Sequence, residues 1–152
     1  MDRRSLSTGF TLIEVLIVVV LIAVLAATLI PQFSSSAQDA KESSLRYDLK
    51  SLRTQIDMYK LDHGGQPPSL SGGTLAQLNA ATNASGGIGT PGPSFPYGPY
   101  MMNAFPPNPI TGIGTVIAMT AYPPTAETGN GGWQYDPTTG RIAADSAKYL
   151  TW

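Results

Sequence analysis

The stretch Gly9-Phe10-Thr11-Leu12-Ile13-Glu14 opens an apolar run that continues to Ile30. Within this run only Thr11, Glu14 and Thr28 are not apolar, and Glu14 carries the only charge. As a helix with a rise of about 1.5 Å per residue, the run would be about 32 Å long. A bilayer hydrocarbon core is about 30 Å thick, so the run predicts a membrane-spanning helix.

Glu14 is the residue of this run that needs an explanation, because a charge inside a membrane helix is costly and usually functional. An alternative interpretation is an ordinary secretory signal, with Val24-Leu25-Ala26 as its small-residue cleavage site. Two observations argue against a signal. Its apolar region would not normally carry an acid near the start, and here the run is long and leads directly into another helical pattern.

The composition of the 152-residue chain excludes several classes of function. Nine Lys and Arg against ten Asp and Glu give a net charge of -1, which does not indicate nucleic-acid binding. The chain has no cysteine and only one histidine, His63, so a zinc site or a catalytic triad is not expected. Gly86-Gly87-Ile88-Gly89 lacks the lysine of a phosphate-binding loop. The sequence therefore predicts that the chain is not an enzyme.

A second helical pattern follows Pro31, a residue type that kinks or ends a helix. Apolar residues then recur at spacings of three to five, which indicates one stripe along a helix; they are Phe33, Ala37, Ala40, Leu45, Leu49, Leu52, Ile56 and Tyr59. We predict one helix from about Phe10 to Asp62, kinked at Pro31 and ended by the glycine and proline pairs of residues 64–68. On its solvated face we expect two i,i+4 ion pairs, Glu42–Arg46 and Arg53–Asp57.

Residues 63–152 predict a small α+β head that must use the stripe from Leu45 to Tyr59 to complete its core. Residues 74–81 could form a short helix, and residues 83–112 resemble an ordered but irregular Gly/Pro loop. Strand signals follow at residues 114–122, 133–135 and 141–143, with turn chemistry at residues 136–140. The expected result is a hairpin of about residues 132–145 in a small antiparallel sheet packed on the helix.

The leader followed by Gly9, Phe10 and an acid at Glu14, with the apolar helix after it, resembles the N-terminus of type IV prepilins and type II secretion pseudopilins. Pro31 also lies where that family commonly has a helix-kinking proline. More loosely, Gly98-Pro99-Tyr100, Pro107-Asn108-Pro109 and the hairpin resemble the major pseudopilin G branch. The resemblance implies a pilin-like fold with four parts: a leader of residues 1–9, a transmembrane half-helix 10–30, an amphipathic half-helix 31–62 and a head 63–152.

The resemblance also implies a function. A prepilin peptidase would cut between Gly9 and Phe10 and N-methylate Phe10, and Glu14 would pair with the new α-amino group during assembly. The chain would then be a pseudopilin, a structural subunit of a helical homo-oligomeric filament that drives protein export. Its partners would be minor pseudopilins and an inner-membrane assembly platform. Arg3 and Arg4 favour the cytoplasmic side, so the head would lie outside the cytoplasm, on the periplasmic side of the inner membrane.

Three alternatives for function and cofactor stay open at this point. The chain could be a type IV pilin for adhesion, motility or DNA uptake, or a membrane-tethered binding domain that does not polymerise. The G branch usually has an acid-rich loop that binds calcium, whereas the corresponding residues 108–112 contain no acid. Calcium prefers six to eight oxygen ligands, so we expect no cofactor, with calcium as the alternative. For His63 we expect helix capping or solvation, and for the aromatic side chains of the head core packing.

Overall fold

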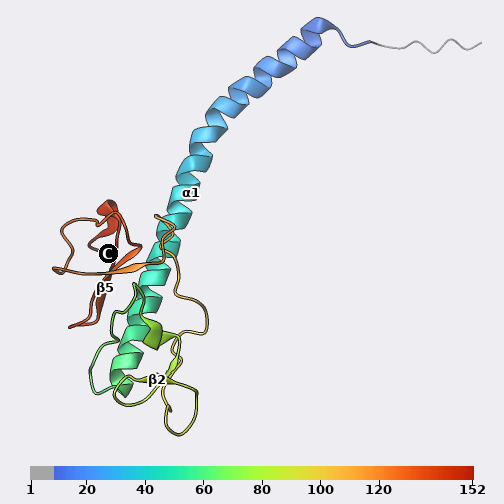
Figure 1. Ribbon diagram of the computed structural model, residues 1–152. Coiled ribbons are helices and arrows are strands. Elements are labelled where there is room, and N and C mark those ends of the chain that lie inside the picture. Colours follow the sequence, from blue (N-terminus) through green and yellow to red (C-terminus); the bar gives the residue numbers. More distant parts are fainter. Residues whose placement is uncertain (1–8) are drawn as a thin grey trace, which may run out of the picture. The chain divides into compact units, whose positions relative to one another are not determined.

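The computed structural model describes residues 9–152, apart from the side chains of residues 30–34. The leader, apart from Gly9, therefore lies outside the described residues. Two units can be distinguished, the first ending at Ala40 and the second covering Lys41–Trp152. Helix α1 belongs to both, and the head is built on its C-terminal part (Figure 1).

Helix α1 comprises Leu12–Asp62 and has 51 residues, which confirms the long helix predicted from the sequence. It ends where glycine permits positive φ: Gly64 and Gly65 have φ of 62° and 86°, and the Gly65 amide donates to the Lys60 carbonyl at 2.8 Å. Backbone of helical conformation continues through Pro31. The kink predicted there concerns residues whose side chains lie outside the described part, and it stays a prediction.

The predicted apolar stripe forms the centre of the head. Leu45, Leu49, Leu52, Ile56 and Tyr59 are all at most 2% exposed. Burial of a side chain of this size contributes about 1.5–3 kcal/mol, so the stripe is a major part of the head's stability. The residues packed around it come from the whole second unit and are Leu75, Leu78, Val116, Trp133, Tyr135, Ile142, Ala144 and Tyr149. This arrangement confirms an α+β fold in which the head packs on the amphipathic half of α1.

The main sheet has the strand order β3-β4-β5, formed by Val116–Ala118, Trp133–Asp136 and Arg141–Ala144. Strands β4 and β5 make the predicted antiparallel hairpin, with Trp133 opposite Ala144. Strand β3 pairs with β4 in parallel, Val116 opposite Trp133, so the sheet is mixed. The reason is the long connection after β3, because a dozen or more residues can return the chain to the same end of the sheet.

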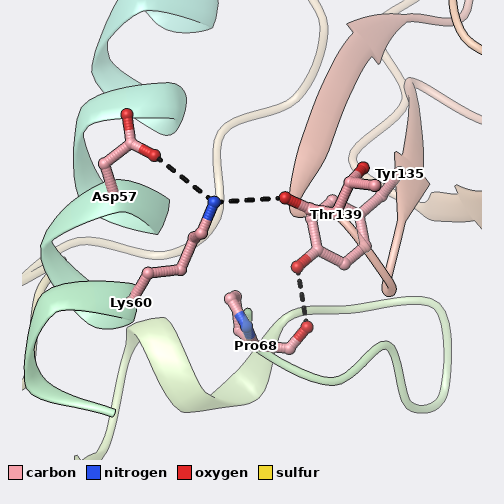
Figure 2. A network of polar contacts seen from close by, with 5 residues as sticks. All are labelled: Asp57, Lys60, Pro68, Tyr135 and Thr139. Carbon is pink, nitrogen blue, oxygen red and sulfur yellow. Dashed lines mark hydrogen bonds and ion pairs between the residues drawn. The ribbon is translucent and has the colours of Figure 1, made fainter. Parts of the chain in front are cut away.

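Polar contacts attach the hairpin to the rest of the head (Figure 2). The Tyr135 hydroxyl donates to the Pro68 carbonyl at 2.7 Å, and the Lys60 ammonium donates to the Thr139 carbonyl at 3.2 Å. The same ammonium lies 4.0 Å from the Asp57 carboxylate. The last turns of α1 and the segment that follows it therefore hold the turn end of the hairpin.

The segment between α1 and β3 is irregular, as predicted, with two short exceptions. Strands β1 (Ala81–Thr82) and β2 (Ile88–Gly89) pair in an antiparallel sheet of their own. The helix predicted for residues 74–81 is wrong in extent, since only the 3-10 turn η1 (Ala76–Leu78) forms. Its inward residues Leu75 and Leu78 are fully buried, as expected. A second such turn, η2 (Ala147–Tyr149), follows β5.

The charges predicted to form i,i+4 pairs on a solvated face contact the head. The Glu42 carboxylate accepts from the Lys148 ammonium and the Tyr149 hydroxyl, both at 2.7 Å. Arg46 lies over the ring of Trp152, 4.4 Å from its centroid. Arg53 donates to backbone oxygens of Ile142 and Trp152. The solvated-face interpretation is wrong for Glu42 and Arg53, because both are partly buried beside the stripe and reach segments distant in sequence, whereas Arg46 is exposed as expected.

Candidate functional site

The first turn of α1 is closed by a reciprocal cap between Thr11 and Glu14. The carboxylate oxygen Oε2 of Glu14 accepts from the Thr11 amide at 2.8 Å and from the Thr11 hydroxyl at 2.7 Å. The Thr11 hydroxyl oxygen in turn accepts from the Glu14 amide at 3.3 Å. This is a capping box, which satisfies two amides that the helix itself leaves without partners. Glu14 therefore has a structural role that our interpretation of the sequence missed.

The cap uses only one of the two carboxylate oxygens. Within the described residues, Oε1 of Glu14 makes no hydrogen bond, and a carboxylate can accept about four. The preceding residue pair is open: Phe10 is 87% exposed, and a Cβ added at Gly9 would meet no atom within 4 Å. Packing among the described residues therefore gives no reason for glycine at position 9.

The apolar part of the first unit exposes its side chains on every side. Each large apolar side chain from Val15 to Leu25 is more than half exposed. Leu12–Leu29 is the one helical segment of the described residues that is long and apolar enough to cross a membrane. An exposed apolar surface of this size requires an apolar environment, such as lipid or other apolar helices.

His63 is buried and hydrogen-bonded, so the expectation of solvation is wrong. Its imidazole is 6% exposed; Nδ1 lies 2.8 Å from the Tyr59 carbonyl oxygen and Nε2 lies 3.1 Å from the Thr82 hydroxyl. Because a carbonyl only accepts, Nδ1 carries the proton and Nε2 accepts from the hydroxyl. His63 thus joins the end of α1 to β1, and it also satisfies a carbonyl at the helix end, as a cap does.

Two buried polar residues of the head were not identified as functional from the sequence. Asn108 is fully buried: its amide nitrogen donates to the Gly132 carbonyl at 2.7 Å, and its Oδ1 accepts from the Ile110 amide at 2.8 Å. Asp145, 2% exposed, accepts from the backbone and hydroxyl of Thr128, from the Gly131 amide and from Gln134. Both residues connect loops to the sheet, Asn108 through Gly132 and Asp145 through Thr128, which are distant from them in sequence.

The acids of the head do not gather into a metal-binding group. In the part of the chain that the structure describes, no three His, Cys, Asp or Glu side chains are placed to hold a metal ion. Asp145 is surrounded by donors, and Glu127 accepts from the Ala147 amide at 2.9 Å at the start of η2. Hydrogen-bond donors occupy positions that a cation would need around these carboxylates.

Comparison with known proteins identifies the N-terminal segment. The family described as "Prokaryotic N-terminal methylation motif" matches residues 4–30, which include Gly9, Phe10 and Glu14. The chain carries a prepilin-type N-terminus. This finding agrees with the exposed Gly9-Phe10 pair and the apolar helix that follows it.

Relatives named as type II secretion proteins extend the comparison. "Type II secretion system core protein G" of Pseudomonas aeruginosa is 43% identical over 72 residues, 47% of this chain and 50% of the relative. The protein of the same name from Dickeya chrysanthemi is 36% identical over 72 residues, 47% of this chain and 46% of the relative. That of Escherichia coli is 34% identical over 87 residues, 53% of this chain and 60% of the relative.

These matches confirm the resemblance to the pseudopilin G branch. The chain spans about half the length of most of the curated relatives it matches. No solved structure matches. The predicted site residues Gly9, Phe10 and Glu14 lie together at the start of α1, whereas Pro31 lies farther along the same helix.

Proposed function

We propose that this chain is a pseudopilin, a structural subunit that polymerises into the pseudopilus of a type II secretion-type apparatus and has no catalytic role. A prepilin peptidase would cut between Gly9 and Phe10 and methylate the amine of Phe10. The proposal rests chiefly on one observation, an exposed apolar helix that directly follows this pair and carries a single acid. Such a helix suits a membrane first and the interior of a filament later.

Glu14 would link processing to assembly. A carboxylate costs about 2.5–3.5 kcal/mol at the centre of a membrane helix on insertion scales, which is an upper bound for Glu14 in the first turn, and a cationic amine nearby offsets part of the cost. Because Oε2 is engaged with Thr11, the other oxygen, Oε1, is available to the new α-amino group of Phe10 on the same or a neighbouring subunit. We further propose that the head lies outside the cytoplasm, since Arg3 and Arg4 favour the cytoplasmic side. Minor pseudopilins and an inner-membrane platform would be its partners.

Mass spectrometry of the mature chain tests the processing step. We expect a chain that begins at Phe10 and carries one methyl group on its amine. A chain that still begins at Met1, or one cut after Ala26, would overturn the proposal.

Substitution of Glu14 tests its assembly role. We expect Glu14→Ala to be cleaved and inserted normally but to form no polymer. Thr28→Ala is the matched control, because Thr28 is another polar residue of the same span and its hydroxyl only donates to the Leu25 carbonyl. Thr11→Val separates capping from pairing, since it removes the hydroxyl of the cap and leaves the Glu14 carboxylate. Assembly that fails equally with Thr11→Val would assign Glu14 to helix capping alone.

Electron microscopy separates this function from the two alternatives. Long surface fibres at natural expression levels would indicate a type IV pilin in place of a pseudopilin. A tethered binding domain would show no polymer, and Glu14→Ala would leave its behaviour unchanged.

A further inference from the structure

A pocket lined by cations lies between the last turns of α1 and the β4–β5 hairpin. It has a volume of about 390 Å³, and its walls include Arg53, Lys60 and Arg141, with the single acid Asp57. Figure 2 shows one side of this region, where Lys60 reaches from α1 to Thr139 of the hairpin turn. The pocket is large enough to receive an acidic side chain from another molecule.

Two of the three cations that line this pocket, Lys60 and Arg141, are contacted mainly by neutral groups. Lys60 donates to the Thr139 carbonyl, whereas Arg53 donates to the Ile142 carbonyl and to a backbone oxygen of Trp152. Arg141 lies over the ring of Tyr122, 4.6 Å from its centroid. Carbonyls and aromatic rings orient a cation without cancelling its charge. The one carboxylate near them, Asp57, lies 4.0 Å from Lys60 and its side chain is 73% exposed, so it compensates little of the charge.

The opposite flank of α1 carries an acid without a partner. Asp48 is half-buried, and within the described residues it receives no hydrogen bond and forms no ion pair. Burial raises the pKa of the Asp48 carboxyl, with no opposing contribution from a donor or a cation. The other acids of the second unit, apart from Asp57 in the pocket, already have partners within the chain, namely Glu42, Asp62, Glu127, Asp136 and Asp145.

We propose that the cation-lined pocket of one chain receives Asp48 of a second copy of the same chain. This inference rests on the proposed function and names a contact by which the subunits would polymerise. The two surfaces differ, so the contact is heterologous and repeats from copy to copy as an open helical array. Charge complementarity favours a second copy as the occupant of the pocket. The unpaired acid Asp48 and the uncompensated cations of the pocket belong to the same chain.

The helix geometry sets how the copies would be related. Asp48 and Asp57 are nine residues apart, which is about two and a half turns, so the acid and the pocket lie on opposite flanks of α1. At about 1.5 Å per residue, their separation along the helix is about 14 Å. Each contact would therefore displace the next subunit by roughly that distance along α1. Between the two flanks lies an exposed apolar ridge of Tyr47, Met58 and Leu61, which would be partly covered by the neighbour.

Cysteine crosslinking in the full-length chain tests the contact directly, because the natural chain has no cysteine. One population carries Asp48→Cys and a second, with a different tag, carries Arg141→Cys; both are expressed together and oxidised in the membrane. We expect the disulfide between the two tags to dominate. Asp39→Cys is the matched control, as an exposed acid of the same helix, and we expect it to crosslink poorly to Arg141→Cys. Equal yields with the control, or dominance of products between identical variants, would overturn the proposal.

Charge reversal supplies an independent test. Asp48→Lys and Arg141→Glu should each lower the yield of polymer about tenfold, and the double variant should restore it to within about twofold of the natural chain. A double variant no better than either single one contradicts the contact. Asp48→Asn separates an assembly defect from misfolding. We expect its melting temperature to be unchanged or higher, because burial disfavours the charged form of this acid, and we expect its assembly to be weaker.

These outcomes separate the contact from the proposed function. If the natural chain forms no polymer and does not begin at Phe10, the proposed function fails. If it polymerises and requires Glu14, but assembly is indifferent to Asp48 and Arg141, only the contact fails.

Discussion

The imidazole of His63 stacks on the phenol ring of Tyr59, with ring centroids 3.8 Å apart and ring planes inclined by 5°. Tyr97 and Tyr100 flank the same imidazole at centroid distances of 5.3 Å and 6.3 Å. Together with the hydrogen bond to Thr82, this cluster closes the end of α1 against the first small sheet. The only histidine of the chain therefore stabilises the head.

We predict that His63→Ala lowers the free energy of unfolding by about 2–3 kcal/mol, because the buried hydroxyl of Thr82 loses its partner. His63→Phe should lose less, since it retains the stack and forfeits only the hydrogen bonds. Chemical denaturation of the full chain in detergent measures both. Equal stability of the Ala variant and the natural chain would contradict the structural role.

Asp145→Asn should destabilise the loop that precedes β4. The carboxylate accepts four hydrogen bonds through two oxygens, and an amide would place its own NH2 group against those donors. We expect a loss of about 2–3 kcal/mol and faster proteolysis within residues 122–131. Glu127→Gln is the control, because that exposed side chain keeps an oxygen for the Ala147 amide. Equal proteolysis of the two variants would argue against a special role for Asp145.

Gly132→Ala should be among the most disruptive single-methyl changes in the head. A Cβ at this position would overlap the carbonyl oxygen of Ile113, which is backbone and cannot rotate away. We expect destabilisation of about 3 kcal/mol. Gly92→Ala is the matched control, because its Cβ would come no closer than 4.0 Å to the Thr90 carbonyl oxygen. Thermal unfolding of both variants measures the difference in stability. Similar melting temperatures for the two would refute the packing argument.

Two tyrosines should ionise at unusually high pH. Burial, with the hydrogen bond to Asp62, raises the pKa of Tyr100, and burial, with the nearby charge of Asp136, raises that of Tyr135. The folded chain then holds these protons more tightly than the unfolded chain, whose tyrosines titrate near pH 10. The stabilisation is complete below about pH 10 and is lost as the pH rises toward the folded values.

Absorbance titration of the phenolate measures this effect. We expect a late phase that weakens in Tyr100→Phe and in Tyr135→Phe. A single phase near the ordinary tyrosine value for the natural chain would show that neither phenol is perturbed.

Calcium should have no effect on the stability of the head. The carboxylates of Glu127 and Asp145 already accept hydrogen bonds, and the side-chain amide of Asn108 donates to the Gly132 carbonyl. We predict that millimolar calcium and a chelator give melting temperatures within about 1 °C of each other. A clear rise in the melting temperature with calcium would contradict this prediction and support calcium binding, the alternative that the sequence left open.

Features of the fold that depend on local periodicity could be predicted from the sequence. The stripe from Leu45 to Tyr59 repeats with the helical period, and the glycines after Asp62 end the helix, so α1 and its buried face were predictable. The β4–β5 hairpin was predictable from its turn residues. Strand β3 was predictable as a strand, but its parallel pairing depends on where the intervening chain returns, which no local pattern specifies.

The polar contacts divide in the same way, into those between residues close in sequence, which could be predicted, and those between distant residues, which could not. Thr11 and Glu14 are three residues apart, so their capping box was readable from the sequence and was overlooked. His63 meets Thr82, 19 residues away, and Asp145 meets Thr128, 17 residues away. Nothing in the neighbourhood of His63 or Asp145 indicates these partners. The charges beside the stripe, such as Glu42 and Arg53, were misassigned for the same reason.

All of the groups that cap α1 lie on the C-terminal side of Gly9. The Thr11 amide, the Thr11 hydroxyl and the Glu14 carboxylate would all remain in a chain that begins at Phe10. Processing would therefore leave the helix start as it was and add one positive charge, one residue before the cap. The precursor and the mature subunit would differ in electrostatics more than in conformation, so the peptidase would act as a charge switch on a helix that is already formed.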